Sequence, residues 1–118
     1  MAVKKVKLWL RDLGNGAFDV PDSDPPGKTS ESTPKATHAM TISFSQEVSF
    51  NGGAKMQPLG VSRPSGVLKI HFRKSANGEL EVLGSDPPGR PAKPDDVQVL
   101  FVPIGAEISP VSIQTEKF

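Results

Sequence analysis

The sequence predicts an all-β protein: a two-sheet sandwich or flattened barrel of about seven to eight short strands, with an internal pseudo-twofold duplication. Apolar and polar residues alternate with a period of two in several segments, which is typical of strands with one buried face. The 118 residues include 12 Pro and 11 Gly, and no segment keeps a 3.6-residue apolar period, so long helices are excluded. A strand-and-turn segment also occurs twice.

The repeated segment covers residues 5–28 and 67–90 without a gap, so that equivalent residues lie 62 positions apart. Ten of the 24 positions are identical, and they include the consecutive run Ser-Asp-Pro-Pro-Gly at 23–27 and 85–89. Similar turn-rich composition alone does not produce five consecutive identities together with a shared alternation. We therefore expect one domain, residues 1–118, built from a first repeat (1–62) and a second repeat (63–118).

Each copy is expected to form a β-hairpin around an Asn-Gly turn, at 15–16 and at 77–78. The residues predicted to face the core are Val6, Leu8 and Leu10 in the first copy and Leu68, Ile70 and Phe72 in the second. A two-residue loop would turn Phe18 and Val20 to the wrong face. A three-residue loop that ends in a left-handed Gly corrects this and predicts the pairs Leu10–Val20, Arg11–Asp19, Phe72–Val82 and Arg73–Glu81.

Further strands are expected after each hairpin. A third strand is predicted at Met40–Phe44 and at Val97–Phe101, aligned as M-x-I-x-F with V-x-V-x-F if the second loop is five residues shorter. Other strands are predicted at Glu47–Phe50, near Met56–Val61 and at Ile108–Gln114. The polar, Pro-containing stretch Lys28–Thr37 is predicted to be an exposed loop.

The composition excludes several classes of function. The net charge is +1, so binding of a nucleic acid would need a local basic patch. The chain has no Cys, which excludes disulfides, thiolate metal sites and cysteine nucleophiles. Charged residues interrupt the apolar N-terminal stretch, and no stretch reaches membrane-spanning length. We expect synthesis in the cytoplasm without a signal peptide, no membrane partner, and a possible place in a virion.

Two ligand-binding motifs are rejected. Gly27-Lys28-Thr29 resembles the end of a phosphate-binding loop, but position 22 is Asp instead of Gly, and prolines prevent the helix that would face the phosphates. Asp19, Asp22 and Asp24 lack the Gly and the terminal Glu of a calcium-binding loop.

No catalytic group is evident either. His38 and His71 have no visible partners for a catalytic triad or a metal site, and adjacent loop acids such as Asp95 and Asp96 are usually solvated. The sequence therefore predicts no enzyme activity, no metal and no cofactor.

The outward face of the duplicated strand is the main candidate contact surface. Side chains two apart on a strand lie about 7 Å apart, close to the phosphate spacing of a nucleic acid, and a Trp between cations offers a stacking surface. The alternative is an ordinary solvated face whose arginines pair with Asp19 and Glu81. The candidate partner or anion contacts are Lys5, Lys7, Trp9, Arg11, Lys69, His71 and Arg73. The candidate contact loops are Ser23, Asp24, Pro25, Pro26 and Gly27, and Ser85, Asp86, Pro87, Pro88 and Gly89.

These observations favour a non-catalytic structural or interaction subunit of a repeating protein assembly, such as a capsid, decoration or tail component of a phage or virus particle. Its partners would be further copies of itself or other assembly subunits. One alternative is a small module that binds anions or single-stranded nucleic acid, and another is a phage-encoded inhibitor or adaptor protein. If another chain covers Trp9, assembly is favoured, whereas an open Trp9 beside free lysines favours ligand binding.

Overall fold

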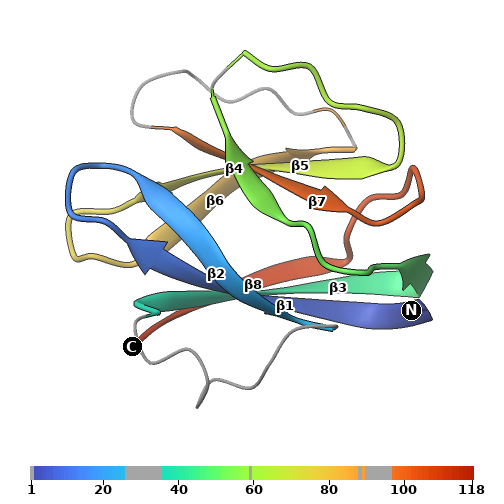
Figure 1. Cartoon of the computed structure of the whole chain (residues 1–118), viewed down its shortest axis with the longest axis horizontal. Coiled ribbons are helices and arrows are strands. Elements are labelled where there is room, and N and C mark those ends of the chain that lie inside the picture. The colour runs from blue at the N-terminus through green and yellow to red at the C-terminus, as the bar shows by residue number, and fades with distance from the viewer. Residues whose placement is uncertain (1, 26–35, 59, 88, 90–96) are drawn as a thin grey trace.

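The computed structural model describes residues 2–25, 36–58, 60–87, 89 and 97–118. Two four-stranded antiparallel sheets pack face to face (Figure 1). The strands are β1 (Ala2–Asp12), β2 (Phe18–Asp24), β3 (His38–Ser49), β4 (Lys55–Gln57), β5 (Val67–Lys74), β6 (Leu80–Asp86), β7 (Gln98–Pro103) and β8 (Ser112–Lys117). Sheet A has the order β2-β1-β3-β8, and sheet B has the order β4-β7-β5-β6. The predicted all-β, two-sheet sandwich is therefore confirmed.

Both hairpins close with the predicted three-residue loop. The residue before each loop donates its N–H to the carbonyl oxygen of the residue after it: Leu13 to Ala17 at 3.0 Å and Ser75 to Glu79 at 2.8 Å. Gly16 and Gly78 end the loops with the same φ of 87°. Glycine adopts this left-handed conformation without the clash that a Cβ would cause, which is why Asn-Gly occurs in both copies.

The hairpin registers agree with the sequence prediction, with one addition. Arg11 lies opposite Asp19, and the predicted pairs Phe72–Val82 and Arg73–Glu81 are both present. Both return strands also carry a β-bulge at equivalent places, beside Trp9 in β1 and His71 in β5. In the first hairpin the bulge sets Val20 and Pro21 opposite Leu10, in place of a simple Leu10–Val20 pair.

The third strands are also equivalent, but the predicted alignment between them is wrong by three residues. Lys7 lies opposite Thr41, and the equivalent Lys69 lies opposite Phe101. Thr41 and Phe101 are therefore 60 positions apart, and Met40 corresponds to Leu100 instead of Val97. The error arose because β7 is apolar on both faces, so that the alternation in its sequence did not show which residues face the core.

The remaining predicted strands are present with shifted bounds. The segment Glu47–Phe50 is mostly the end of β3, which continues to Ser49 past a bulge in its pairing with β1. The strand predicted near 56–61 is the short β4, and the strand predicted at 108–114 begins later, as β8. Most of the loop predicted at 28–37 lies outside the described residues.

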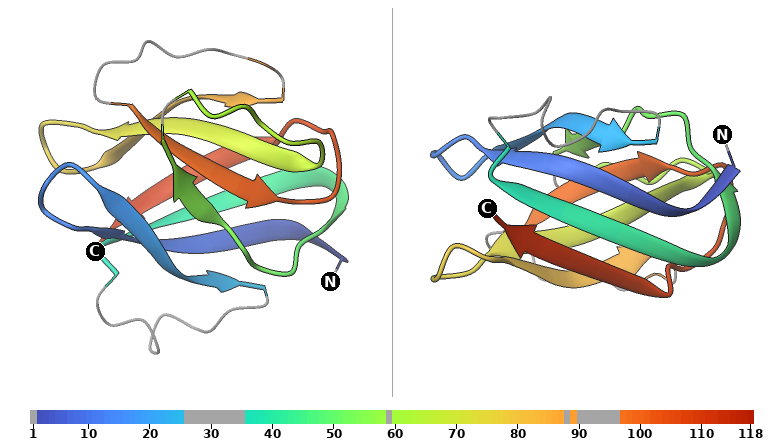
Figure 2. Two further views of the ribbon diagram at one scale, coloured as in Figure 1. Left: turned by 45° about the horizontal axis from the view of Figure 1, so that its top comes forward. Right: turned by 90° about the horizontal axis from the view of Figure 1, so that it is seen from below.

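The fourth strand of each half crosses to the other sheet. β4 follows β3 in the chain but pairs with β7 in sheet B, whereas β8 follows β7 but pairs with β3 in sheet A. This exchange is visible in Figure 2, where β8 lies beside β3. Because each sheet contains strands from both halves, neither half can complete its own sheet.

The core lies between the two sheets and is filled by the inward side chains of both. β1 and β5 contribute the six residues predicted from their alternation, and all six are fully buried. β3 contributes Met40, Ile42 and Phe44, β7 contributes Leu100 and Val102, and Ile104 follows β7 directly. Their burial supplies most of the stabilisation of the fold.

The two hairpin turns lie at the same end of the sandwich, where each half bonds to the other. His38 Nε2 donates to the Gly78 carbonyl oxygen (2.7 Å), and Gln98 Nε2 donates to the Gly16 carbonyl oxygen (2.6 Å). Both side chains come from the first residue of a third strand, and both acceptors are turn glycines 62 positions apart. The pseudo-twofold relation therefore extends to individual hydrogen bonds.

Candidate functional site

The outward face of β1 differs from the expected polar surface. Trp9 points away from the core, as predicted, but its side chain is only 2% exposed. Lys7 Nζ lies 5.0 Å from the centre of the Trp9 ring and 3.6 Å from Glu116 of β8. The prediction that Trp9 offers an open stacking surface is wrong, because the side chain is almost completely buried and Lys7 Nζ lies over the ring.

The equivalent face of β5 is also largely closed. His71 is 7% exposed, and Lys69 Nζ donates to the Val61 carbonyl oxygen at 3.3 Å. Burial, reinforced by the Lys69 charge and opposed by Asp86, lowers the pKa of His71 below its ordinary value. The imidazole is therefore neutral at pH 7 and adds no cation to this face. The expectation of an accessible His71 is wrong.

The two arginines of the face are paired, as the hairpin register predicted. Arg11 Nε lies 3.1 Å from Asp19 Oδ1, and Arg73 Nε lies 2.9 Å from Glu81 Oε1. Of the seven candidate contacts, Lys5 is the one that is exposed and makes no bond or ion pair in the described part of the chain. A nucleic acid would therefore meet few free cations on this surface.

The candidate loops are described only in part. Ser23 and Ser85 are both buried, and the Ser85 hydroxyl donates to the Pro87 carbonyl oxygen at 2.9 Å. The Asp24–Pro25 and Asp86–Pro87 peptide bonds are both cis. Gly89 donates its N–H to the Ser85 carbonyl oxygen at 3.1 Å. Pro26, Gly27 and Pro88 lie outside the described residues, and the role of these loops as contacts stays a prediction.

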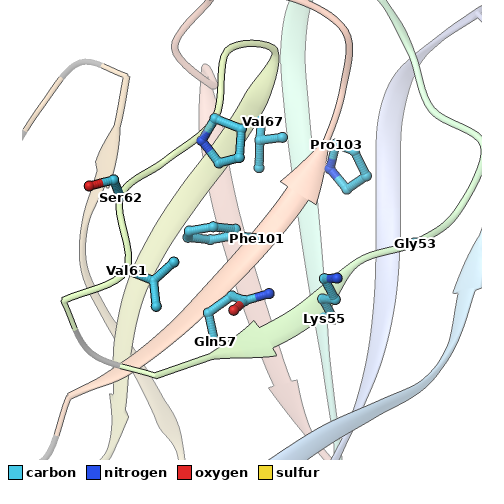
Figure 3. Close-up of a pocket in the computed structure, with 9 residues that line it drawn as sticks. Gly53, Lys55, Gln57, Val61, Ser62, Val67, Phe101 and Pro103 are labelled. Atoms are coloured by element: carbon cyan, nitrogen blue, oxygen red, sulfur yellow. The ribbon is translucent and has the colours of Figure 1, made fainter.

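An open hollow of about 390 Å3 lies on the outer face of sheet B. Figure 3 shows the Phe101 ring at its centre, with Val61 and Pro103 on either side and Lys55 and Gln57 on β4. The segment that connects β4 to β5 forms one wall. Its equivalent on sheet A is a polar hollow beside Thr41 and Glu116.

The connection between β4 and β5 is fixed by an ion-pair network that the sequence did not reveal. Arg63 Nη1 lies 2.8 Å from Glu107 and donates to the Val67 carbonyl oxygen at 3.1 Å. The Gly66 N–H and the Arg63 guanidinium both lower the pKa of Glu107. Because Arg63 and Glu107 are 44 positions apart, no local pattern links them, and the network has a structural role.

Three of the four sheet edges carry features that oppose pairing with another strand. β2 contains Pro21, which has no N–H, and a bulge; β6 contains the equivalent bulge at Leu83. β4 is only three residues long. Bulges, prolines and short strands are the usual protections of an exposed sheet edge.

The fourth edge, β8, has none of these features. It has six residues without Pro or Gly, and it pairs with β3 without a register shift. No described strand pairs with its other side, which lies along the rim of the sandwich (Figure 2). β6 of sheet B is next to β8 at this rim, where the Thr115 hydroxyl donates to the Leu80 carbonyl oxygen without forming a strand pair. Val111 and Phe118 flank β8 and are 65% and 58% exposed, and the remaining exposed large apolar side chain of the described chain is Leu13. An open edge between exposed apolar side chains is typical of a surface that pairs with a partner.

The direction of the β8 backbone groups follows from its pairing with β3. Phe118 donates its N–H to the Thr37 carbonyl oxygen at 2.9 Å, so even-numbered residues direct their N–H and C=O groups toward β3. The odd-numbered residues Ile113, Thr115 and Lys117 therefore direct theirs to the open side. Little in the sequence indicated this edge, since Ile113 is the one large apolar residue within β8.

No family model matches the chain, and neither curated protein sequences nor solved structures are significantly similar to it. In the described part of the chain, no group of three or more His, Asp or Glu side chains is arranged to hold a metal ion. No described helix has the length and apolar character needed to cross a membrane.

Proposed function

We propose that this protein is a non-catalytic interaction subunit of a repeating protein assembly, and that it joins a neighbour through the β8 edge. The observation that carries the proposal is the unprotected β8 strand between the exposed side chains of Val111 and Phe118. A phage or virus particle is the repeating assembly that we favour from the sequence.

The backbone of β8 is able to pair with one more strand. Its open side presents a row of N–H and C=O groups, which an added strand satisfies with main-chain hydrogen bonds. The flanking apolar side chains would be buried in the same step, at roughly 25 cal/mol for each Å2 removed from water. The other three edges gain less, because a bulge, a proline or a short length interrupts the ladder.

The test measures association by light scattering on a size-exclusion column, from micromolar to millimolar protein, alone and with candidate assembly subunits. We expect an oligomer or a stable complex for the natural sequence. Thr115→Pro removes an N–H on the open side without removing a bond to β3, so it should give a monomer. Thr115→Val is the matched control, because it loses the same hydroxyl, which donates to the Leu80 carbonyl oxygen at 3.3 Å, but keeps the N–H.

Val111→Ser is a second variant that changes only an exposed side chain, and it should weaken association without affecting folding. Circular dichroism and urea unfolding verify that each variant is folded. A natural protein that stays monomeric at the highest concentration and binds no assembly subunit contradicts the proposed function. Association of the natural protein and of Thr115→Pro with equal strength contradicts the use of β8.

A further inference from the structure

We infer that the partner at the β8 edge is a second copy of this chain, paired antiparallel about a twofold axis with Gln114 opposite Gln114. This inference rests on the proposed function and names the partner and the register. It predicts one continuous eight-stranded sheet made from two copies of sheet A.

The hydrogen-bond pattern restricts the possible registers. Only odd-numbered residues of β8 direct backbone groups outward, so an antiparallel partner must set odd-numbered residues opposite odd-numbered ones. When Gln114 faces Gln114, Ile113 of one copy faces Thr115 of the other, in both directions. Each such pair exchanges two main-chain bonds. Even-numbered residues then face each other as non-hydrogen-bonded pairs, whose Cα atoms approach more closely.

Side-chain complementarity selects this register among those that the backbone permits. It sets the end of β8 next to Val111 in one copy against the end next to Phe118 in the other. The two exposed apolar side chains therefore meet at each end of the interface, once in each direction. Because the two ends of β8 carry matching apolar groups, the strand is complementary to itself, as a twofold interface requires.

The charges of β8 permit the same arrangement. Its two charged residues, Glu116 and Lys117, lie at one end of the strand, so antiparallel pairing sets them at opposite ends of the interface. Glu116 faces Ser112 of the second copy, and no like charges face each other. Glu116 also keeps its contact with Lys7 on the outer face of its own sheet.

The absence of cysteine from the chain allows a direct test. Gln114→Cys places the single thiol of each copy at the twofold axis, where non-hydrogen-bonded partners have the Cα separation that a disulfide needs. Gln46→Cys is the matched control, because it is the same replacement at an exposed position of β3. Both variants are oxidised in a glutathione buffer at micromolar protein and analysed by non-reducing electrophoresis and mass spectrometry.

We expect the yield of covalent dimer for Gln114→Cys to exceed that of Gln46→Cys by on the order of tenfold, because pairing raises the effective thiol concentration toward millimolar. The double variant Ser112→Cys/Glu116→Cys should also form covalent dimers, whereas each of its single variants should not. This combination distinguishes the proposed register from random collision.

The outcomes separate this inference from the proposed function. If the natural protein associates but Gln114→Cys cross-links no better than Gln46→Cys, the second-copy register is wrong, whereas assembly through another partner stands. If dimers cross-link through Thr115→Cys instead of Gln114→Cys, the strands pair in a register shifted by two residues, and the proposed one is overturned. A protein that stays monomeric and binds no assembly subunit overturns the inference and the proposed function together.

Discussion

The hydrogen bond from His38 to the opposite hairpin turn provides the sharpest test of the pseudo-twofold fold. His38 is 4% exposed; its Nε2 donates to the Gly78 carbonyl oxygen, and its Nδ1 lies 2.7 Å from the Thr37 hydroxyl. His38→Leu keeps an apolar side chain of similar size but removes both bonds. His38→Gln introduces the residue that the other repeat uses at the equivalent position, where Gln98 donates to the Gly16 carbonyl oxygen.

The expected cost of His38→Leu follows from the Gly78 carbonyl oxygen, which loses its partner, whereas the Thr37 hydroxyl keeps its bonds to the Asp12 N–H and the Leu10 carbonyl oxygen. A buried polar group that loses its partner costs about 1–3 kcal/mol, so we expect a loss of about 1–3 kcal/mol in the free energy of unfolding. This corresponds to a fall in Tm of roughly 5–10 °C for a domain of this size. His38→Gln keeps a donor for the Gly78 carbonyl oxygen, so it should cost about 1 kcal/mol or less.

Urea unfolding followed by tryptophan fluorescence measures both variants. Trp9 is the single Trp of the chain and is buried, so its emission shifts to longer wavelength when the sandwich unfolds. The m-value should be unchanged, because the same surface becomes exposed. A loss below about 0.5 kcal/mol for His38→Leu, within the usual range for surface changes, would show that the bond between His38 and the opposite turn does not stabilise the fold. So would an equal loss for His38→Gln.

Two further predictions concern the turns and the contact between the hairpins. The Lys74 ammonium, 2.6 Å from the Asp12 carboxylate, and the Gly14 N–H lower the pKa of Asp12 below its unfolded value, so ionised Asp12 stabilises the fold above that value. Asp12→Asn should therefore lower the free energy of unfolding at pH 7 by about 1 kcal/mol, and this difference from the natural protein should vanish as the pH falls through the folded-state pKa of Asp12. Urea unfolding at pH 7 and pH 3 measures the difference, and an equal difference at both pH values contradicts the prediction. Gly16→Ala and Gly78→Ala should each lower the free energy of unfolding by about 1–2 kcal/mol, because both glycines have positive φ. Thermal unfolding should show a larger loss for Gly78→Ala, because a Cβ at this position also meets Lys117 Nζ at 3.0 Å. Equal Tm values for the two variants would contradict this account.

The hairpins were predictable because their information is local. Alternation identified the buried faces of β1 and β5, and the Asn-Gly positions with parity fixed a three-residue loop, which in turn placed Arg11 opposite Asp19. Each of these features depends on residues within about a dozen positions of one another. The structure confirms the fold class for the same reason: short alternating segments with frequent Pro and Gly leave few alternatives to a sandwich.

The candidate site was predicted less well, because exposure depends on distant segments. Trp9 points outward as its parity requires, but whether an outward side chain meets water depends on the segments packed around it. Lys7 lies over the ring and pairs with Glu116 of β8, which is 107 positions from Trp9. The sequence also gave no reason to single out β8. Its open edge exists only because the chain after β7 crosses to sheet A and leaves one side of the new strand without a described strand that pairs with it.

The all-β class, the repeated hairpins and the charge pairs across them follow from the order of the amino acids, because strand period, turn chemistry and parity act over short distances along the chain. The exchange of β4 and β8 between the sheets, the burial of Trp9 and His71, and the position of the unpaired edge follow from the packing of the folded chain. These properties depend on which segments lie side by side, and packing two layers around one core sets that choice for the whole chain at once.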